Sequence, residues 1–281
     1  MNEMRSLHAQ DLHDACADAA GHAVTAPPGG EGPRTVQNLL GRVMTADLIP
    51  RLVASANESR PAPDDALRDR LLRAVLRGDR SEASAIGLQC ARQGMAPDVL
   101  MQELLAPVAD ALGRSWEEDR CDFITVTLGM QVLDGVLDEI GAAPQGRMPT
   151  GSRRALVAAA PGEQHLFGAR MAAEMLFRAG WHVTRVSAPG RAGLLAAASE
   201  APYDLIGISV ANANALDRLG DLVAEIRRVS LNRGVRIALG GSAVTRNPVA
   251  AGRQGADWIA VDGADGVAKA AAPVARADDE D

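Results

Sequence analysis

The 281-residue chain has few residues of the kinds that stabilise small secreted proteins or span membranes. Its three cysteines, Cys16, Cys90 and Cys121, form neither a Cys-x-x-Cys pair nor an even set, so we expect free thiols. The longest apolar stretches, such as 155–161, are too short to cross a bilayer, and residues 1–21 lack the apolar core of a signal peptide. We therefore expect a reduced, cytoplasmic protein with no membrane contact.

Clustered positive charge and recognisable catalytic motifs are also missing. The net charge is −7 and the lysines and arginines are dispersed, which argues against direct nucleic-acid binding. Paired carboxylates, a nucleophile elbow, a phosphate loop and a metal-binding cysteine set are not apparent, so the sequence does not indicate an enzyme. Aromatic residues make up only 2% of the chain, which draws attention to the tryptophans. Trp181 and Trp258 fall on expected strands, where packing explains them.

The sequence divides into five segments. Residues 1–35 are weakly patterned and rich in proline and glycine near their end, which predicts a flexible extension. Residues 36–141 predict a helical bundle, and 142–152 a linker. Residues 153–275 predict an α/β domain, and 276–281 an acidic tail.

Helical periodicity supports the bundle. Apolar residues recur every three or four positions in five segments. The first expected helix covers 36–53, with a kink or break at Pro50, and the second is capped by Asp64 or Asp65. The third covers 81–93, the fourth is opened by Pro97, and the fifth runs from Val126 to Ile140.

Strand and helix patterns alternate in the second domain. Strands are expected near 154–160, 182–187, 204–210, 235–240 and 257–261, with helices near 165–179, 190–200, 214–231, 244–253 and 264–274. This alternation predicts a Rossmann-like, flavodoxin-like domain with a five-stranded parallel sheet.

The loop after the first expected strand carries the pattern E-x-H-x-x-G, from Glu163 through His165 to Gly168. Open α/β sheets bind ligands at such strand ends. Forty residues separate Gly168 from Ser209, which begins Ser-Val-Ala, and twenty-eight separate Ala211 from Gly240. This order and spacing resemble the cobalamin-binding fingerprint D-x-H-x-x-G … S-x-L … G-G. Glu163 replaces the aspartate of that fingerprint and Ala211 replaces its leucine.

The resemblance implies a role for each of these residues. In that family the lower benzimidazole of cobalamin leaves the cobalt and enters a groove, and a histidine takes its place. His165 would then be the metal ligand and Glu163 would meet its other ring nitrogen. The groove and its surroundings would comprise Leu166, Gly168, Ser209, Ala211, Gly240 and Gly241. From the residues alone two alternatives stay open: a loop histidine that caps a helix, or a histidine that binds heme iron.

A second motif, W-x-x-D-R-x-D-F-x-x-V-T-x-G, runs from Trp116 to Gly129. It resembles the AerR/PpaA antirepressors, which are relatives of the heme-binding SCHIC domains. That resemblance implies that Trp116 lies above the upper face of the corrin; alternatively, it only closes the bundle end. Photoreceptors of the CarH type have a Glu-His pair in this region. Here Val126-Thr127 takes that place, so we expect no upper histidine ligand.

The resemblance implies a light- and cobalamin-responsive antirepressor of photosynthesis genes. The cofactor would be adenosylcobalamin or hydroxocobalamin, and the partner a DNA-binding repressor of the PpsR/CrtJ class. Two other functions stay open. One is a corrinoid methyl carrier of a methyltransferase system, and the other is a heme-binding redox sensor.

Overall fold

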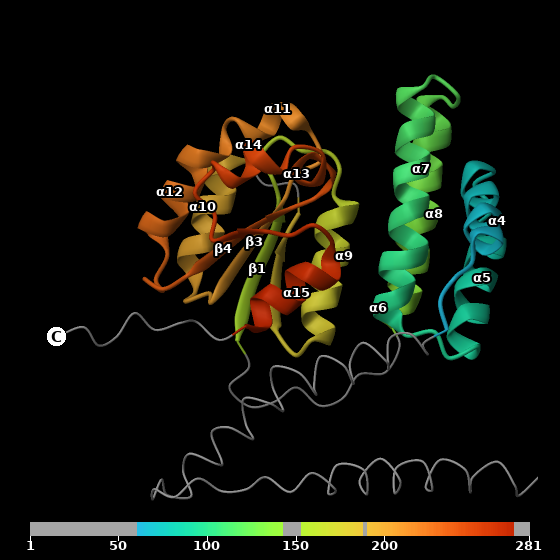
Figure 1. Cartoon of the computed structure of the whole chain (residues 1–281), viewed down its shortest axis with the longest axis horizontal. Helices are drawn as coiled ribbons and strands as arrows, with labels where there is room; N and C mark the ends of the chain where they lie inside the picture. The colour runs from blue at the N-terminus through green and yellow to red at the C-terminus, as the bar shows by residue number, and fades with distance from the viewer. Residues whose placement is uncertain (1–60, 143–152, 188–189, 273–281) are drawn as a thin grey trace, which may run out of the picture. The chain divides into compact units, whose positions relative to one another are not determined.

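The computed structural model describes residues 61–142, 153–187 and 190–272 (Figure 1). The predicted extension over 1–35, the helix expected over 36–53, most of the linker and the acidic tail lie outside this range. Within the described residues, no helix combines the length and apolar character needed to cross a bilayer.

The helical part begins where the predicted cap lies. The Asp64 carboxylate accepts a hydrogen bond from the Leu67 N–H at 2.8 Å, and Asp79 and Asp122 cap later helices in the same way. Pro97 opens a continuous helical run that contains one π-helical segment, η2. The elements are α4 (Asp65–Leu76), α5 (Arg80–Arg92), α6 (Pro97–Val99), η2 (Leu100–Leu105), α7 (Ala106–Glu117) and α8 (Phe123–Gly141).

The second part is a five-stranded sheet whose neighbouring strands are all parallel, in the order β2-β1-β3-β4-β5. This confirms the predicted Rossmann-like, flavodoxin-like fold class. Its strands are β1 (Arg154–Ala159), β2 (His182–Val186), β3 (Leu205–Ser209), β4 (Arg236–Gly240) and β5 (Trp258–Ile259). Its helices are α9 (Phe167–Arg178), α10 (Arg191–Glu200), α11 (Ala213–Leu216), α12 (Leu219–Val229), α13 (Ser242–Arg246), α14 (Pro248–Gly252) and α15 (Gly263–Ala271).

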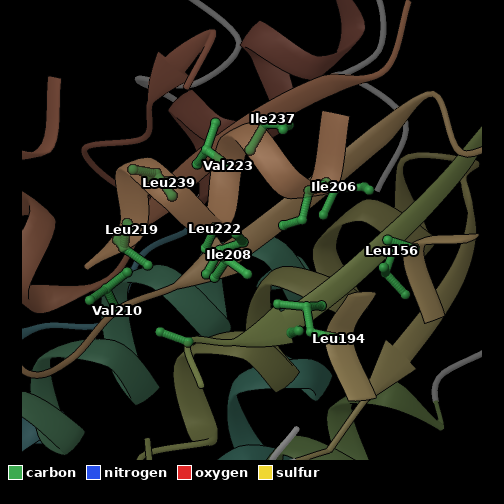
Figure 2. Packing of buried hydrophobic residues seen from close by; sticks show 14 of the residues in the cluster. Leu156, Leu194, Ile206, Ile208, Val210, Leu219, Leu222, Val223, Ile237 and Leu239 are labelled. Atoms are coloured by element: carbon green, nitrogen blue, oxygen red, sulfur yellow. The ribbon is translucent and has the colours of Figure 1, made fainter. Parts of the chain in front are cut away.

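Helices cover both faces of the sheet, which explains why the central strands β1 and β3 are almost entirely apolar, whereas the edge strand β2 carries exposed polar residues. Figure 1 shows α9 and α15 over one face and α10 and α12 over the other. Alternate residues of β1 divide between the two faces: Leu156 lies in the α10–α12 core, and Val157 in the α9–α15 core. Figure 2 shows the first of these cores, where Leu194 and Leu222 belong to the same buried cluster as the strand residues.

Three expected elements are shorter than predicted. The helix expected over 214–231 is split into α11 and α12, and both Leu216 and Leu219 are thereby buried. The helix expected over 244–253 is split at Pro248, which lacks an N–H and disfavours helical geometry in the residue before it. Strand β5 is only two residues long because the Val261 N–H donates to the Asp265 carboxylate and the chain turns into α15.

Helix α9 packs against α8 through both charged and apolar side chains. The Arg170 guanidinium pairs with Asp134 and, at 2.5 Å, with Asp138. Burial raises the pKa of the Asp134 carboxyl above its usual range, although Arg170 opposes this shift. Phe167 and Met175 of α9 belong to the buried core of the helical part. Helix α9 is therefore held against the bundle as well as against the sheet.

Gly129 allows α8 to approach its neighbours closely. A Cβ there would lie 2.9 Å from both Val75 Cγ1 and Leu112 Cδ2. Gly129→Ala should lower the free energy of unfolding by about 1–2 kcal/mol, because overpacking outweighs a gain in helix propensity of about 1 kcal/mol. Gly113→Ala in α7 has no atom within 4 Å of its new Cβ and should stabilise the protein slightly. Urea denaturation measures both; equal effects of the two substitutions would contradict the close approach.

Candidate functional site

The candidate site lies where β1 and β3 end side by side. From β1 the chain continues to α9 on one face of the sheet, and the connection that leads into β3 runs through α10 on the other face. In open α/β sheets such a reversal leaves a crevice at the carboxyl ends of the strands. Glu163 and His165 follow β1, and Ala211 follows β3, so the fold brings these predicted residues together.

Glu163 joins the two loops at this crevice. Its side chain is almost completely buried, at 3% exposed. Oε1 accepts hydrogen bonds from the backbone N–H groups of Ala211 at 3.0 Å and Asn212 at 2.7 Å. Oε2 lies 3.4 Å from Nδ1 of His165. A buried carboxylate is costly unless such partners surround it, so Glu163 fixes the relative position of both loops.

His165 has the opposite environment. Its side chain is 75% exposed, although its Nδ1 faces the buried Glu163 carboxylate. When Nδ1 carries the proton and donates a hydrogen bond to the Glu163 carboxylate, Nε2 is the ring nitrogen with a free lone pair. This arrangement presents one neutral imidazole nitrogen at the sheet edge, as a metal ligand requires.

Two of the predicted glycines lie where a side chain would collide with the protein itself. A Cβ on Gly168 would lie 2.9 Å from Ser209 Oγ. Gly241 has φ +100°, and a Cβ there would lie 2.5 Å from the Val210 carbonyl oxygen. A Cβ on Gly240 would lie 3.6 Å from Ala260 Cβ, which is an ordinary van der Waals distance. The absence of a side chain at Gly240 therefore leaves space in the cavity and is not needed to avoid a collision.

A cavity of about 430 Å³ opens beside these residues. Gly168, Ser209, Gly240 and Gly241 all line it. With Leu205, Gly207 and Ile208, Ser209 makes four of the five residues of β3 that line the cavity. At about 3.3 Å per residue, the cavity follows β3 for about 13 Å, from Ser209 at the sheet edge to Leu205. Its lining is largely apolar, which suits an aromatic group with a few hydrogen-bonding atoms.

The bundle supplies a wall of this cavity that the sequence did not predict. Gln102 of η2 and Ala106, Ala109 and Asp110 of α7 line it. The sequence feature that could have predicted this wall is the recurrence of small residues in α7, because small side chains on one side of a helix leave space beside it. Burial raises the pKa of the Asp110 carboxyl above its ordinary value, whereas Arg114 and Arg246 lower it.

Helix α9 supplies further lining residues. Met171 and Met175 both pack with the buried cluster of the bundle. They also line the cavity, so they combine both roles.

The remaining predicted site residues do not line the cavity. Leu166 is half-buried and immediately precedes α9, and Ala211 meets Glu163 through its backbone N–H. Trp116 at the end of α7 is 45% exposed and contacts Phe123 edge-to-face, with ring centroids 6.2 Å apart. Neither His165 nor Trp116 is among the described residues that line the cavity, so their assignment to the cofactor stays a prediction.

These features fit a metal-containing cofactor that carries a long, flat appendage. The exposed imidazole suits axial ligation, and the cavity beside it accepts a group that lies along β3. Gly168, Gly241 and Gly263 mark close approaches in the walls of that cavity, because a Cβ on any of them would lie within 3.0 Å of a neighbouring atom.

Comparison with known proteins gives matches over both parts of the chain. Residues 153–271 match a B12 binding domain family, and residues 67–140 match a second B12 binding domain family. A Rhodobacter capsulatus protein, described as an uncharacterized 20.5 kDa protein in the bchF-crtJ intergenic region, is 29% identical over 163 residues, which are 55% of this chain and 81% of that protein.

The fold resembles that of a solved corrinoid protein. The monomethylamine corrinoid protein of Methanosarcina barkeri superposes with a TM-score of 0.62 at 15% identity, over 74% of this chain and 98% of that one. A cobalamin-binding protein of Desulfitobacterium hafniense is 18% identical and has a TM-score of 0.39, over 72% of this chain and 96% of that one.

Removal of the Glu163 carboxylate tests the bridge between the loops. Glu163→Ala leaves two backbone N–H groups without their acceptor and should lower the free energy of unfolding by about 2–4 kcal/mol. Glu163→Gln keeps one acceptor oxygen and should cost about 1 kcal/mol. Chemical denaturation measures both, with Glu200→Gln on the exposed end of α10 as the control. If Glu163→Ala were as stable as the control, the bridge would not hold the loops.

Proposed function

The chain belongs to the B12-binding domain proteins, and we propose that it binds cobalamin and acts as a light-responsive antirepressor of transcription. The observation that carries the cofactor assignment is the cavity along β3, which begins at Ser209 and Gly241 beside the His165 loop. A nucleotide tail needs such a space, whereas heme has no tail to fill it. The proposed cofactor is therefore cobalamin, as adenosylcobalamin or hydroxocobalamin.

Each residue of the site has a separate task in this proposal. His165 offers Nε2 to the cobalt, while the buried Glu163 keeps the proton on Nδ1 and fixes the ring. Ser209 offers a hydroxyl at the mouth of the groove, Gly168 and Gly241 avoid collisions within its walls, and Gly240 leaves room for the tail. Cobalamin with an upper alkyl ligand supplies the sensitivity to light.

The regulatory role is supported by the Trp116–Gly129 motif and by the Rhodobacter capsulatus relative. The name of that relative places it between bchF and crtJ, and CrtJ-class repressors are the partners that the AerR/PpaA resemblance implies. We propose that this chain binds a repressor of that class and weakens its hold on DNA. Binding then depends on the state of the cofactor only if the protein contacts the two states differently.

A corrinoid methyl carrier is the second candidate, because the whole Methanosarcina barkeri corrinoid protein shares this fold. The two functions differ in their partners. A methyl carrier must accept a methyl group in the presence of a methyltransferase, whereas an antirepressor must change the DNA affinity of a repressor. Repressor–promoter gel shifts with the loaded chain, in the dark and after illumination, decide between them.

His165→Ala tests the axial ligand. The variant should lose the visible spectrum of histidine-ligated cobalamin while its circular dichroism stays unchanged, because the side chain is exposed and not part of a core. His182→Ala, an exposed histidine at the start of β2, is the matched control and should keep the spectrum. A wild-type spectrum and affinity in His165→Ala would exclude His165 as the ligand. A spectrum seen only with heme would exclude cobalamin.

Gly207→Val tests the groove without disturbing the fold. Gly207 lines the cavity, and a Cβ there would meet only Val157 Cγ2, at 3.9 Å. Valine favours a strand, so the melting temperature should stay equal or rise, while cobalamin affinity should fall at least about ten-fold. Gly241→Val is a poorer test, because its positive φ and the Val210 carbonyl would strain the backbone. Unchanged cobalamin affinity in Gly207→Val would place the tail elsewhere.

A further inference from the structure

Three apolar side chains of α8 are exposed next to one another. Phe123 is 68% exposed, Ile124 65% and Leu128 48%. At 100° per residue these three positions share one face of the helix, and we call them the α8 patch. Asp122 already caps the helix, and most of the buried residues of α8 face away from Phe123 and Ile124, so these two side chains contribute little to the core of the bundle. Contiguous exposed patches of large apolar side chains are typical of surfaces that bind another molecule.

The charges beside the patch define what kind of molecule fits it. Residues 117–122, which join α7 to α8, contain four acidic residues and one arginine. Arg120 pairs with Glu118 at 2.6 Å, which leaves the turn with an excess of negative charge. A complementary surface would combine apolar side chains with lysines or arginines at one end. An amphipathic helix with a basic end has this composition.

The patch is also connected to the candidate cofactor site. Phe123 contacts Trp116, which lies at the end of α7. The same helix contributes Ala106, Ala109 and Asp110 to the cavity wall. Asp110 and Trp116 are separated by about 9 Å along the helix axis. One rigid helix therefore touches both the cavity and the aromatic pair at the edge of the patch.

We propose that the α8 patch is the docking surface for an amphipathic helix with a basic end on the partner protein. This proposal rests on the proposed function, in which the partner is a repressor of the PpsR/CrtJ class. Phe123 is the aromatic anchor, Ile124 and Leu128 extend the apolar contact, and the acidic turn orients the partner helix.

The test measures binding of the full-length, cobalamin-loaded chain to a purified PpsR/CrtJ-class repressor by titration calorimetry. The double variant Phe123→Ser with Ile124→Ser should bind at least about ten-fold more weakly, with an unchanged cobalamin spectrum and melting temperature. The matched control replaces two exposed apolar residues on other elements, Leu231→Ser with Val249→Ser, which are 61% and 71% exposed. This control should bind like the wild type.

A second variant tests the charges. Glu117→Lys with Glu118→Lys should weaken binding and reduce its dependence on salt, because the favourable charge contacts are lost. Equal affinity and equal salt dependence in this variant would contradict the basic character of the partner helix.

The outcomes separate the docking surface from the proposed function. If the wild-type chain binds no such repressor in either light or dark, the antirepressor function fails and the docking proposal fails with it. If the wild type binds and Phe123→Ser with Ile124→Ser binds equally well, the function stands and the docking surface is wrong. A lower melting temperature of that variant, or a loss of self-association in sedimentation, would mean that the patch is covered by this chain or a second copy, which also overturns the proposal.

Discussion

The buried carboxylate of Glu163 is the interaction on which the candidate site depends. It is the point where the loops after β1 and β3 are joined, through two backbone N–H groups and one imidazole nitrogen. A carboxylate in this position would be unfavourable without these partners, so its burial requires both loops to be in place. The parallel pairing of β1 with β3 is what brings the three groups within reach. The same contacts restrict His165 while leaving its ring exposed.

Empty space is the second constraint on the site. Leaving a cavity forgoes packing contacts that would otherwise stabilise the domain. Here the cavity is maintained by small residues on three elements: Gly207 in β3, Gly240 in β4 and Ala109 in α7. Gly207 is the clearest case, because the protein itself would tolerate a side chain there. Its small size therefore keeps the cavity open and is not required by the packing of the fold.

The fold was predictable to a greater extent than the site. Apolar periodicity, the caps at Asp64 and Pro97 and the alternation of strand and helix are local signals, and they gave the correct element order. The split at Pro248 was also readable from a local rule, although the prediction missed it. The E-x-H-x-x-G motif directly after the first expected strand correctly placed Glu163 and His165 on the loop between β1 and α9. The hydrogen bonds that the loop after β3 donates to Glu163, and the α7 wall of the cavity, depend on long-range packing that periodicity cannot report.

Helix α7 limits how the proposed switch can work. Coupling between cofactor and partner cannot exceed the difference in contact free energy between the two cofactor states. In this structure α7 lines the cavity at Asp110 and meets Phe123 through Trp116, so a small displacement of one helix changes both surfaces. The π-helical segment η2 directly precedes α7, and such segments often mark functional sites within helices. Because Gln102 of η2 also lines the cavity, the cavity wall and Trp116 belong to one continuous helical run.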